Sequence, residues 1–425
     1  MNKKIFSWCL FDFANSSYSA VIAATIFPVY YASFIVGNES GAGDVWWGRA
    51  IAVSMAVVAF TSPFLGGIAD YSRTRKKMLL FFTLLCVAAV SSFSFLQKGM
   101  VLEGFVLVVL ANIGMESGII FYNSFLPVIS EPTRQGRVSA WGFGIGYAGS
   151  IFSLILALIL IRQGMVSATW LMVALFFVIF SVPAFLFLPG DKQKTGETSV
   201  LPAGEDSSDE SFHNRVAMVK NAALYGFRET LVQLKTLWSR KDQRRFLLAY
   251  LIYEDGVNTV IVFSSIFAAT TLGFKPEELI YMYLIVQATA LFGVFVMARQ
   301  IDYQGPKKVV LCSLGLWIAI TVATYFIKGK IPFIVIASVA GLGLGTIQAA
   351  TRAFYTQFIP EGKESEYFGV YNLVGKSSAI LGPIIFGTLS STFGSQRPAV
   401  LSVSLFFIIG YLILKGVRGG RPNVT

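Results

Sequence analysis

The stretch FYNSFLP at residues 121–127 recurs as FYTQFIP at residues 354–360. Each copy closes a long apolar block, and about 20 apolar residues are enough to cross a lipid bilayer. Repeats at a fixed separation indicate a duplicated architecture. The sequence therefore predicts two related halves, each built from membrane-crossing helices. Two further pairs of stretches recur in the same order, FDFANS (11–16) with YEDGVNT (253–259) and DYSRTRKK (70–77) with DYQGPKK (302–308).

The composition excludes most other classes of protein. The chain has 425 residues, of which 55% are hydrophobic and 13% charged, and its mean hydropathy is +0.66. A soluble domain carries about 25% charged residues. This chain has too little charge to cover a water-facing surface of its size, which excludes a disordered protein and argues against a soluble enzyme. The predicted class is an all-α integral membrane protein.

Hydrophobic runs divide the chain into twelve predicted transmembrane helices in two pseudo-symmetric six-helix bundles. Several runs exceed the length needed to cross a bilayer, so tilted helices are expected. The predicted spans are about 8–36, 46–69, 78–97, 101–129, 138–161, 167–188, 244–272, 278–299, 308–327, 331–359, 366–391 and 396–416. The corresponding domains are an N-terminal bundle (1–188), a cytoplasmic linker (189–243), a C-terminal bundle (244–416) and a cytoplasmic tail (417–425).

The linker has two parts. The first, DKQKTGETSVLPAGEDSSDES (191–211), is polar and predicted to be flexible. The second predicts an amphipathic helix, because apolar residues recur at three- and four-residue steps while basic residues fall largely elsewhere around the helix. This helix can lie along the membrane surface or pack on the bundle's own cytoplasmic face. Its apolar residues are Val216, Val219, Ala223, Phe227, Leu231, Leu234 and Trp238.

The distribution of basic residues predicts the topology. The chain has 34 Lys and Arg against 23 Asp and Glu, a formal net charge of +11. Most basic residues fall in the N-terminus, the loops after even-numbered spans, the linker and the tail. This positive-inside bias predicts that both termini are cytoplasmic. Anionic lipid headgroups are the expected counterpart of the charge, and no nucleic-acid partner is expected. The first helix, with no clear cleavage site, is predicted to act as an uncleaved targeting signal.

No metal, cofactor or enzymatic site is expected. Cys9, Cys86 and Cys312 lie apart in apolar stretches without metal-site spacing, and the single His213 lies in the linker. No phosphate-binding P-loop supports ATP-driven pumping. The run GFGIGYAG (142–149) has dinucleotide-fingerprint spacing but lies inside an apolar span, where small residues indicate helix packing.

Three segments carry a resemblance to a known family, namely WCLFDFANSSYS (8–19), FYNSFLP (121–127) and FLLAYLIYEDGVNTVI (246–261). The chain resembles the major facilitator superfamily along its whole length. More narrowly, it resembles the branch of vacuolar amino-acid effluxers linked to autophagy and their bacterial relatives. The resemblance implies that helices 1, 4, 7 and 10 line a central cavity around which the two halves rock. It also implies export of an amino acid or similar small solute, here across the cell (inner) membrane of a bacterium.

The superfamily's loop motif resembles GGIADYSRTRKK (66–77), with a second copy in ARQIDYQGPKK (298–308). The glycine usual three residues after the aspartate is Arg73 in the first copy and Gly305 in the second, which questions the tight turn in the first copy. The basic cluster can serve as a topology signal. It can also act as a gate in which Asp70 pairs with a neighbouring helix end or an arginine. The predicted gating residues are Asp70, Arg73, Arg75 and Asp302.

Charged residues inside the spans are candidates for function. Each costs about 2.5–3.5 kcal/mol at a helix centre on insertion scales, so its presence needs a reason. Asp12 and Asp255 are related by the repeat and can carry protons, or they can be structural caps. Asn15 and Asn258 follow them by three residues and can bind substrate or hold helices together. The intramembrane charges are Asp12, Glu116, Glu254, Asp255, Arg352 and Lys376.

The sequence allows three roles for Glu116 and Arg352. They can pair across the two halves and separate as the cavity opens, or bind the two ends of a zwitterion, or form a permanent buried ion pair. Lys376 can be a third cavity charge or a snorkelling side chain. The repeat places Tyr122 and Tyr355 symmetrically, as candidates to line the pocket.

The sequence thus predicts a monomeric secondary transporter that moves a small solute by alternating access. Protons or another coupling ion are the predicted energy source, because carboxylates are available on the cavity helices. A lipid or lysolipid transporter on the same fold is one alternative, and a non-transporting membrane receptor or scaffold is the other. Nothing in the sequence suggests an enzyme.

Overall fold

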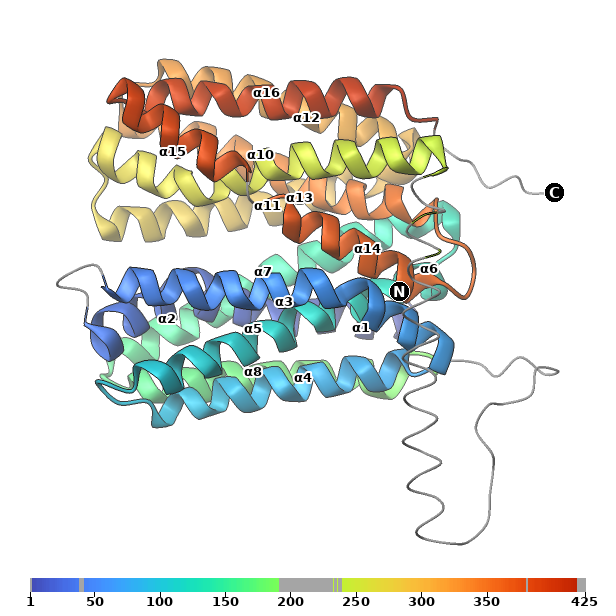
Figure 1. Cartoon of the computed structure of the whole chain (residues 1–425), viewed down its shortest axis with the longest axis horizontal. Coiled ribbons are helices and arrows are strands. Elements are labelled where there is room, and N and C mark those ends of the chain that lie inside the picture. Colours follow the sequence, from blue (N-terminus) through green and yellow to red (C-terminus); the bar gives the residue numbers. More distant parts are fainter. Residues whose placement is uncertain are drawn as a thin grey trace, which may run out of the picture.

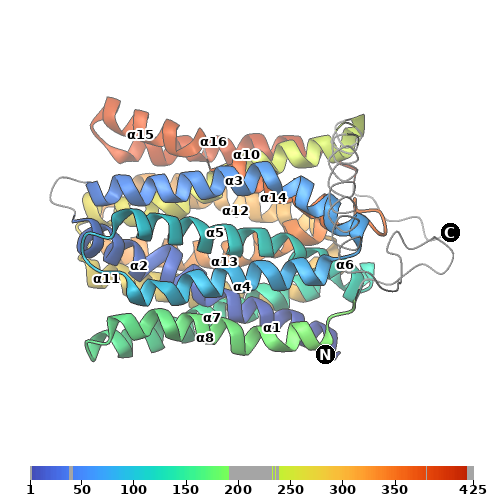
Figure 2. The same ribbon diagram turned by 60° about the horizontal axis from the view of Figure 1, so that its bottom comes forward.

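The structure, a computed structural model, describes residues 2–37, 42–190, 232, 235, 239–379 and 381–418. Two helical bundles lie side by side, the N-terminal one below and the C-terminal one above in Figure 1, and Figure 2 shows the same helices after a turn about the long axis. The polar stretch of the linker and its predicted amphipathic helix lie outside the described residues. Within the described residues every regular element is helical.

The N-terminal bundle contains six membrane-crossing segments. Its elements are α1 (Lys3–Ser17), η1 (Tyr18–Thr25), α2 (Ile26–Val29), η2 (Tyr30–Val36), α3 (Ala42–Ser72), α4 (Arg75–Ser92), η3 (Phe93–Phe95), α5 (Val101–Ser124), α6 (Leu126–Ile129), η4 (Pro132–Arg134), α7 (Gln135–Arg162) and α8 (Val166–Phe187). The predicted boundaries agree with these bounds within a few residues, except that the first helix begins at Lys3.

The C-terminal bundle repeats the arrangement. Its elements are α10 (Lys241–Leu272), α11 (Pro276–Gln304), α12 (Pro306–Phe326), α13 (Lys330–Thr356), α14 (Glu364–Ser377), α15 (Leu381–Phe393) and α16 (Gln396–Lys415). Eleven described segments are long and apolar enough to cross a membrane singly, and α14 with α15 makes the twelfth crossing. The predicted all-α, twelve-helix membrane fold is confirmed, while the domain limits stay a prediction.

The two ends of the molecule differ in the chain segments they carry. We call the end where α1 begins and α16 ends the terminal end; it is on the right in Figure 1. It also carries the turn between α3 and α4 and the start of α14. We call the opposite end, where α10 ends and α13 begins, the loop end.

The first membrane crossing is irregular in the middle. After α1, the segments η1 and η2 have π-helical turns on either side of the four-residue α2. Pro28 lies in α2 and cannot donate a backbone hydrogen bond. Such π turns widen a helix locally and occur often at functional sites. Here η1 brings Ser19 and Ala23 to the wall of the central cavity described below.

The predicted single helix over 366–391 is wrong in one respect, because the chain breaks between α14 and α15. The physical reason is Pro383, which lacks an N–H and would clash with the carbonyl four residues earlier in a continuous helix. In the second helix Pro383 occupies the first turn, where proline is tolerated. The Gly382–Pro383 pair is a local sequence signal for a helix break, and the hydropathy pattern alone does not contain this signal.

Small residues let α7 approach α1 closely. A Cβ added at Gly146 would meet the side chains of Ser16 and Asp12, and one at Gly149 would meet the backbone of Phe13. The glycine run 142–149 therefore serves helix packing, as predicted from its apolar setting.

Candidate functional site

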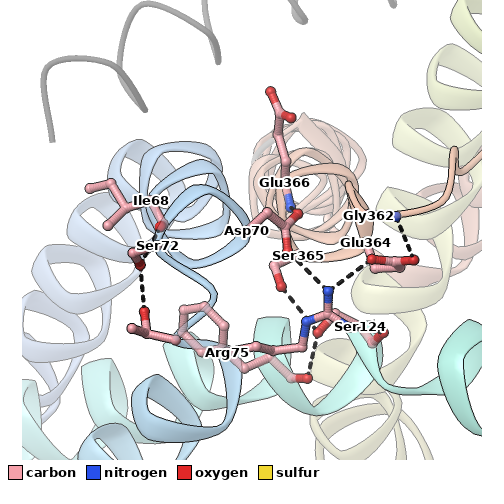
Figure 3. Close-up of polar contacts among 11 residues, drawn as sticks. Ile68, Asp70, Ser72, Arg75, Ser124, Gly362, Glu364, Ser365 and Glu366 are labelled. Carbon is pink, nitrogen blue, oxygen red and sulfur yellow. Dashed lines mark hydrogen bonds and ion pairs between the residues drawn. The ribbon is translucent and has the colours of Figure 1, made fainter. Parts of the chain in front are cut away.

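A buried ion network joins the two halves at the terminal end (Figure 3). Arg75, the first residue of α4, donates from Nη2 to Asp70 Oδ1 at 3.2 Å and to Glu364 Oε2 at 2.8 Å. Asp70 belongs to the N-terminal half and Glu364 begins α14 of the C-terminal half. Their side chains are at most 8% exposed, so the ion pairs are shielded from water. Such charge-assisted bonds are strong only while all partners stay in place.

Asp70 also holds the start of α14 through the backbone. Its Oδ2 accepts the N–H of Glu366 at 2.8 Å, within the first turn of that helix. A carboxylate at a helix N-terminus is favoured by the unpaired N–H groups and by the helix dipole. Next to it, the hydroxyl groups of Ser124 and Ser365 lie 3.3 Å apart across the interface. We call this set, Asp70, Arg75, Ser124, Glu364, Ser365 and Glu366, the first seal.

The repeat-related aspartate makes a second contact of the same kind. Asp302, near the end of α11, accepts the backbone N–H of Arg137 at 3.0 Å, in the first turn of α7. The Arg137 Nε lies 3.4 Å from Asp302 Oδ2. The C-terminal half thus holds a helix start of the N-terminal half, just as Asp70 does in the opposite direction. We call Asp302 and Arg137 the second seal.

The turn at Arg73, where the superfamily's glycine is missing, keeps the tight-turn backbone geometry. Arg73 adopts a φ of 53°, and it is the one described non-glycine residue with positive φ. Gly305, at the same place in the second copy, has a φ of 85°. The first copy therefore makes the tight turn with an L-residue in the left-handed region, at a cost of about 1–2 kcal/mol. The roles of Arg73 and the other loop residues in gating stay a prediction.

A cavity of about 800 Å³ lies between the halves, a size suited to a small organic ligand. Its walls come from α1, η1, α5 and α7 of the N-terminal half and from α10, α11, α12, α13, α15 and α16 of the C-terminal half. It extends from Asp12 to Phe267 and Phe333 near the loop end. Within it, Tyr147 of α7 donates its hydroxyl to Gln348 Oε1 of α13 at 2.8 Å. The cavity and the two seals therefore occupy different levels of the same interface.

Asp12 and Asn15 are the predicted site residues that line this cavity. Asp12 is 7% exposed and Asn15 is 3% exposed. Tyr122 and Asn15 interact with the Asp12 carboxylate, but within the described part of the chain no hydrogen bond of ordinary geometry reaches Asp12 Oδ2 or Asn15 Nδ2. Buried polar atoms are rarely left unpaired, so these two are candidates to bind a ligand.

Asp255 and Asn258 lie instead at the break in the eleventh crossing. The Asp255 carboxylate accepts the N–H of Leu381 at 3.1 Å and that of Gly382 at 2.9 Å. Asn258 donates to the Ser378 hydroxyl at 3.1 Å. The repeat-related aspartates thus differ, because Asp255 caps the start of α15 while Asp12 has an unpaired oxygen.

The hypothesis that Glu116 pairs with Arg352 is wrong for this structure. Glu116 Oε2 of α5 lies 2.7 Å from Lys376 Nζ of α14, an ion pair across the halves. Glu254 lies nearby, since Tyr250 and Asn258, one turn before and after it, contact α14. Lys376 is the cation that interacts electrostatically with Glu254. Lys376 is thus ion-paired with Glu116 of the opposite half and lies close enough to Glu254 of its own half to interact with it electrostatically.

Arg352 crosses from α13 into the N-terminal half. Its Nε and Nη2 donate to Ser139, each at 2.8 Å, and its Nη1 donates to Asn123 at 3.0 Å. The guanidinium also lies 4.9 Å from the ring centroid of Trp8 and 4.0 Å from that of Phe143. It is 3% exposed and is not among the cavity-lining residues. A role for Arg352 in holding a substrate carboxylate is therefore not what this arrangement favours.

Tyr122 and Tyr355 are buried in packing contacts and do not line the cavity. Tyr122 stacks on Trp8 with ring centroids 4.6 Å apart. Tyr355 donates its hydroxyl to the Tyr367 carbonyl at 2.7 Å. Their symmetric placement by the repeat therefore reflects equivalent packing positions.

Sequence reasoning overlooked several polar residues of the cavity wall. They are uncharged, so the cost of burying a charge does not single them out, and Ser16 is the one that lies in a repeated stretch. One signal was available, since a polar side chain in an otherwise apolar span needs a partner or a ligand. These residues are Ser16, Ser19, Tyr147, Tyr283, Gln287 and Gln348.

Comparisons with known proteins agree on the class to which this protein belongs. A family model described as "Vacuole effluxer Atg22 like" matches residues 49–422. The MFS-type transporter YxiO of Bacillus subtilis (strain 168) is 27% identical over 423 residues, covering 96% of this chain and 93% of that protein. Autophagy-related protein 22-1 of Penicillium rubens is 23% identical over 460 residues, covering 88% of this chain and 75% of that protein. The crystal structure of the human organic anion transporter MFSD10 matches with a TM-score of 0.76 at 12% identity, covering 97% of this chain and 99% of that one.

The twelve-helix fold, the repeated seals and these relatives define an integral membrane transporter of the major facilitator superfamily. A small-molecule substrate follows from that class. Within it, the chain belongs to the Atg22-like vacuole effluxer family. The family's members are named as transporters and not as enzymes.

Proposed function

We propose that this protein is a secondary transporter that exports a small organic solute by alternating access. The observation that carries the proposal is the position of the cavity relative to the seals. The cavity extends toward the loop end, whereas Asp70, Arg75 and Glu364 join the halves at the terminal end. Parting of the halves at the terminal end, with closure at the loop end, would give the solute access from the other side.

The direction of export rests on the family and on the predicted topology. The matching family is described as effluxers. Basic residues gather at the terminal end, which predicts that this end faces the cytoplasm. The described conformation is then closed toward the cytoplasm, as expected of an exporter that has delivered its solute.

Proton coupling is proposed to act through Lys376. In this conformation the ammonium group pairs with Glu116 of the opposite half, while Glu254 of its own half has no ion pair within the described residues. When the halves part, Lys376 would exchange Glu116 for Glu254, and a proton would pass to the carboxylate left without a cation. A trapped pH dye in liposomes should record proton movement on addition of a transported solute, absent in Glu254→Gln and retained in the exposed-carboxylate control Glu103→Gln.

The proposal is tested by locking the first seal. Ser124→Cys with Ser365→Cys places two thiols where hydroxyl groups lie 3.3 Å apart across the halves. Cys312, which is exposed, is replaced by serine in all variants. Oxidation should abolish solute flux in proteoliposomes, and reduction should restore it, because the disulfide prevents the halves from parting.

A matched pair within one half provides the control. Ser94 donates to the Ser167 carbonyl at 3.2 Å, and both residues belong to the N-terminal bundle. Oxidation of Ser94→Cys with Ser167→Cys should leave flux unchanged. Full flux in the oxidised 124–365 variant would refute alternating access at this interface.

A further inference from the structure

Among the described residues, the cavity wall carries negative charge and no positive charge. Among its described lining residues Asp12 is the one carboxylate, and no Lys, Arg or His is present. The remaining wall is largely apolar and aromatic, with Phe143, Phe263, Trp317 and Phe333 among the larger side chains. A ligand that fills this space must be mostly apolar, and any charge it buries there must be positive to find a partner.

One oxygen of the Asp12 carboxylate is left for that partner, although Tyr122 and Asn15 also interact with the carboxylate. Its Oδ2 is buried and makes no hydrogen bond of ordinary geometry with any residue that the structure describes. The amide of Asn15, one helical turn on, is also unpartnered at Nδ2 and can present either a donor or an acceptor to a ligand. An ammonium group supplies several N–H donors, so it can satisfy the carboxylate and a second acceptor together.

Arg352, the cation beside the cavity, does not occupy the position of a ligand at Asp12. Arg352 interacts with Asp12 through space, yet its nitrogens donate to Ser139 and Asn123 and its plane lies among aromatic rings. A Cβ on Gly142 would meet Arg352, and one on Gly146 would meet Asp12, so the two charges lie one turn apart along α7. Arg352 is thus held beside the cavity by contacts of its own and is not one of the residues that line it.

Resting on the proposed transport function, we infer that the transported solute is a lipophilic organic amine: one ammonium group, held by Asp12, on a largely apolar body. An anion or the carboxylate of a zwitterion would be buried in this cavity without a cation, which is strongly unfavourable. A neutral analogue would leave Asp12 Oδ2 without a cationic partner. Aromatic faces in the wall add a further preference for a cation, because their π-electron faces attract positive charge.

The test compares ligands that differ in their charged group. Purified protein is titrated by calorimetry with phenethylamine, phenethyl alcohol, phenylacetate and phenylalanine, and with a lysophospholipid. Phenethylamine should bind at least about thirtyfold more tightly than the alcohol, the anion or the zwitterion, as expected for a buried charge pair. Asp12→Asn should remove this preference, whereas the exposed-carboxylate control Glu103→Gln should keep it.

The ligand series in the unaltered protein decides the matter even if Asp12→Asn does not fold. Equal or tighter binding of phenylalanine, phenylacetate or the lysophospholipid would overturn the inference, and so would no binding of the amine. Neither result would bear on the proposed function, which is tested separately by the 124–365 disulfide experiment. Conversely, amine binding with unchanged flux in the oxidised variant would uphold this site and refute the transport cycle.

Discussion

Arg352 shows how one side chain can connect two halves of a transporter. It begins on α13, and its three nitrogens donate to Ser139 and Asn123 of the other half. A lysine has a single ammonium group and cannot reproduce this planar set of donors. The contact forms only while the halves are closed at this level, so Arg352 stabilises the described conformation.

Replacement of Arg352 by lysine should therefore destabilise the protein. Loss of two hydrogen bonds from a charged group costs about 3 kcal/mol, which should appear as a lower thermal unfolding temperature in detergent. Arg162→Lys, at the exposed end of α7, is the control and should unfold like the unaltered protein. An unfolding temperature of Arg352→Lys equal to that control would show that the buried contacts contribute little.

At the residue scale the sequence predicts which charges matter better than it predicts their partners. Asp12, Glu116 and Lys376 stand out because charge inside an apolar span is costly. Their partners depend on how each helix is rotated and where it breaks. Glu116 pairs with Lys376 because α14 lies against α5, which no spacing within one helix reveals.

At the scale of elements, the break between α14 and α15 is held by side chains of α10. Asp255 accepts two N–H groups that start α15, and these would otherwise be unpaired. Gly382 permits this close approach, since a Cβ there would meet Thr259 and Asp255. The break places Lys376, one residue before the end of α14, near both bundles.

Gly382→Ala should disturb this junction. Overpacking at a closed site costs about 1–3 kcal/mol, and thermal unfolding in detergent should reveal it. Gly387→Ala, on the same helix, adds a Cβ with no atom of the described chain within 4 Å and serves as the control. Its unfolding should change by less than about 1 kcal/mol. Equal stability of both variants would mean that the contact between Asp255 and α15 is loose.

The elements themselves are predictable to different degrees. Membrane-crossing segments follow from hydropathy, because length and apolarity are local properties of the chain. The π turns of η1 do not follow from hydropathy, since α-helical and π-helical turns share the same apolar pattern. The break before Leu381 is an intermediate case, with Gly382 and Pro383 as a local signal.

At the scale of the whole molecule, the first and second seals use the same kind of contact, with the roles of the two halves exchanged. Asp70 holds the start of α14 and Asp302 holds the start of α7, so each half carries one carboxylate for the other. The sequence predicts the duplication, and hence the pair of loop motifs. It does not predict which end is closed, because both conformations of such a fold bury the same apolar surfaces and differ by a few kcal/mol.

The most direct measurement is therefore the distance between the halves at both ends, by double electron–electron resonance. Spin labels at Glu131→Cys and Tyr303→Cys report the terminal end, and labels at Leu102→Cys and Ile331→Cys report the loop end; all four positions are exposed. Each distribution is recorded with and without Asp70→Asn and Asp302→Asn together, in a chain with Cys312→Ser.

Removal of both seal carboxylates should populate a longer terminal-end distance and, in the same proportion, a shorter loop-end distance. A loss of about 1.4 kcal/mol changes the ratio of the two conformations tenfold, which the method resolves. A terminal-end distribution unaffected by both substitutions, or a lengthening at both ends, would contradict the central claim that these seals hold one conformation of an alternating-access transporter.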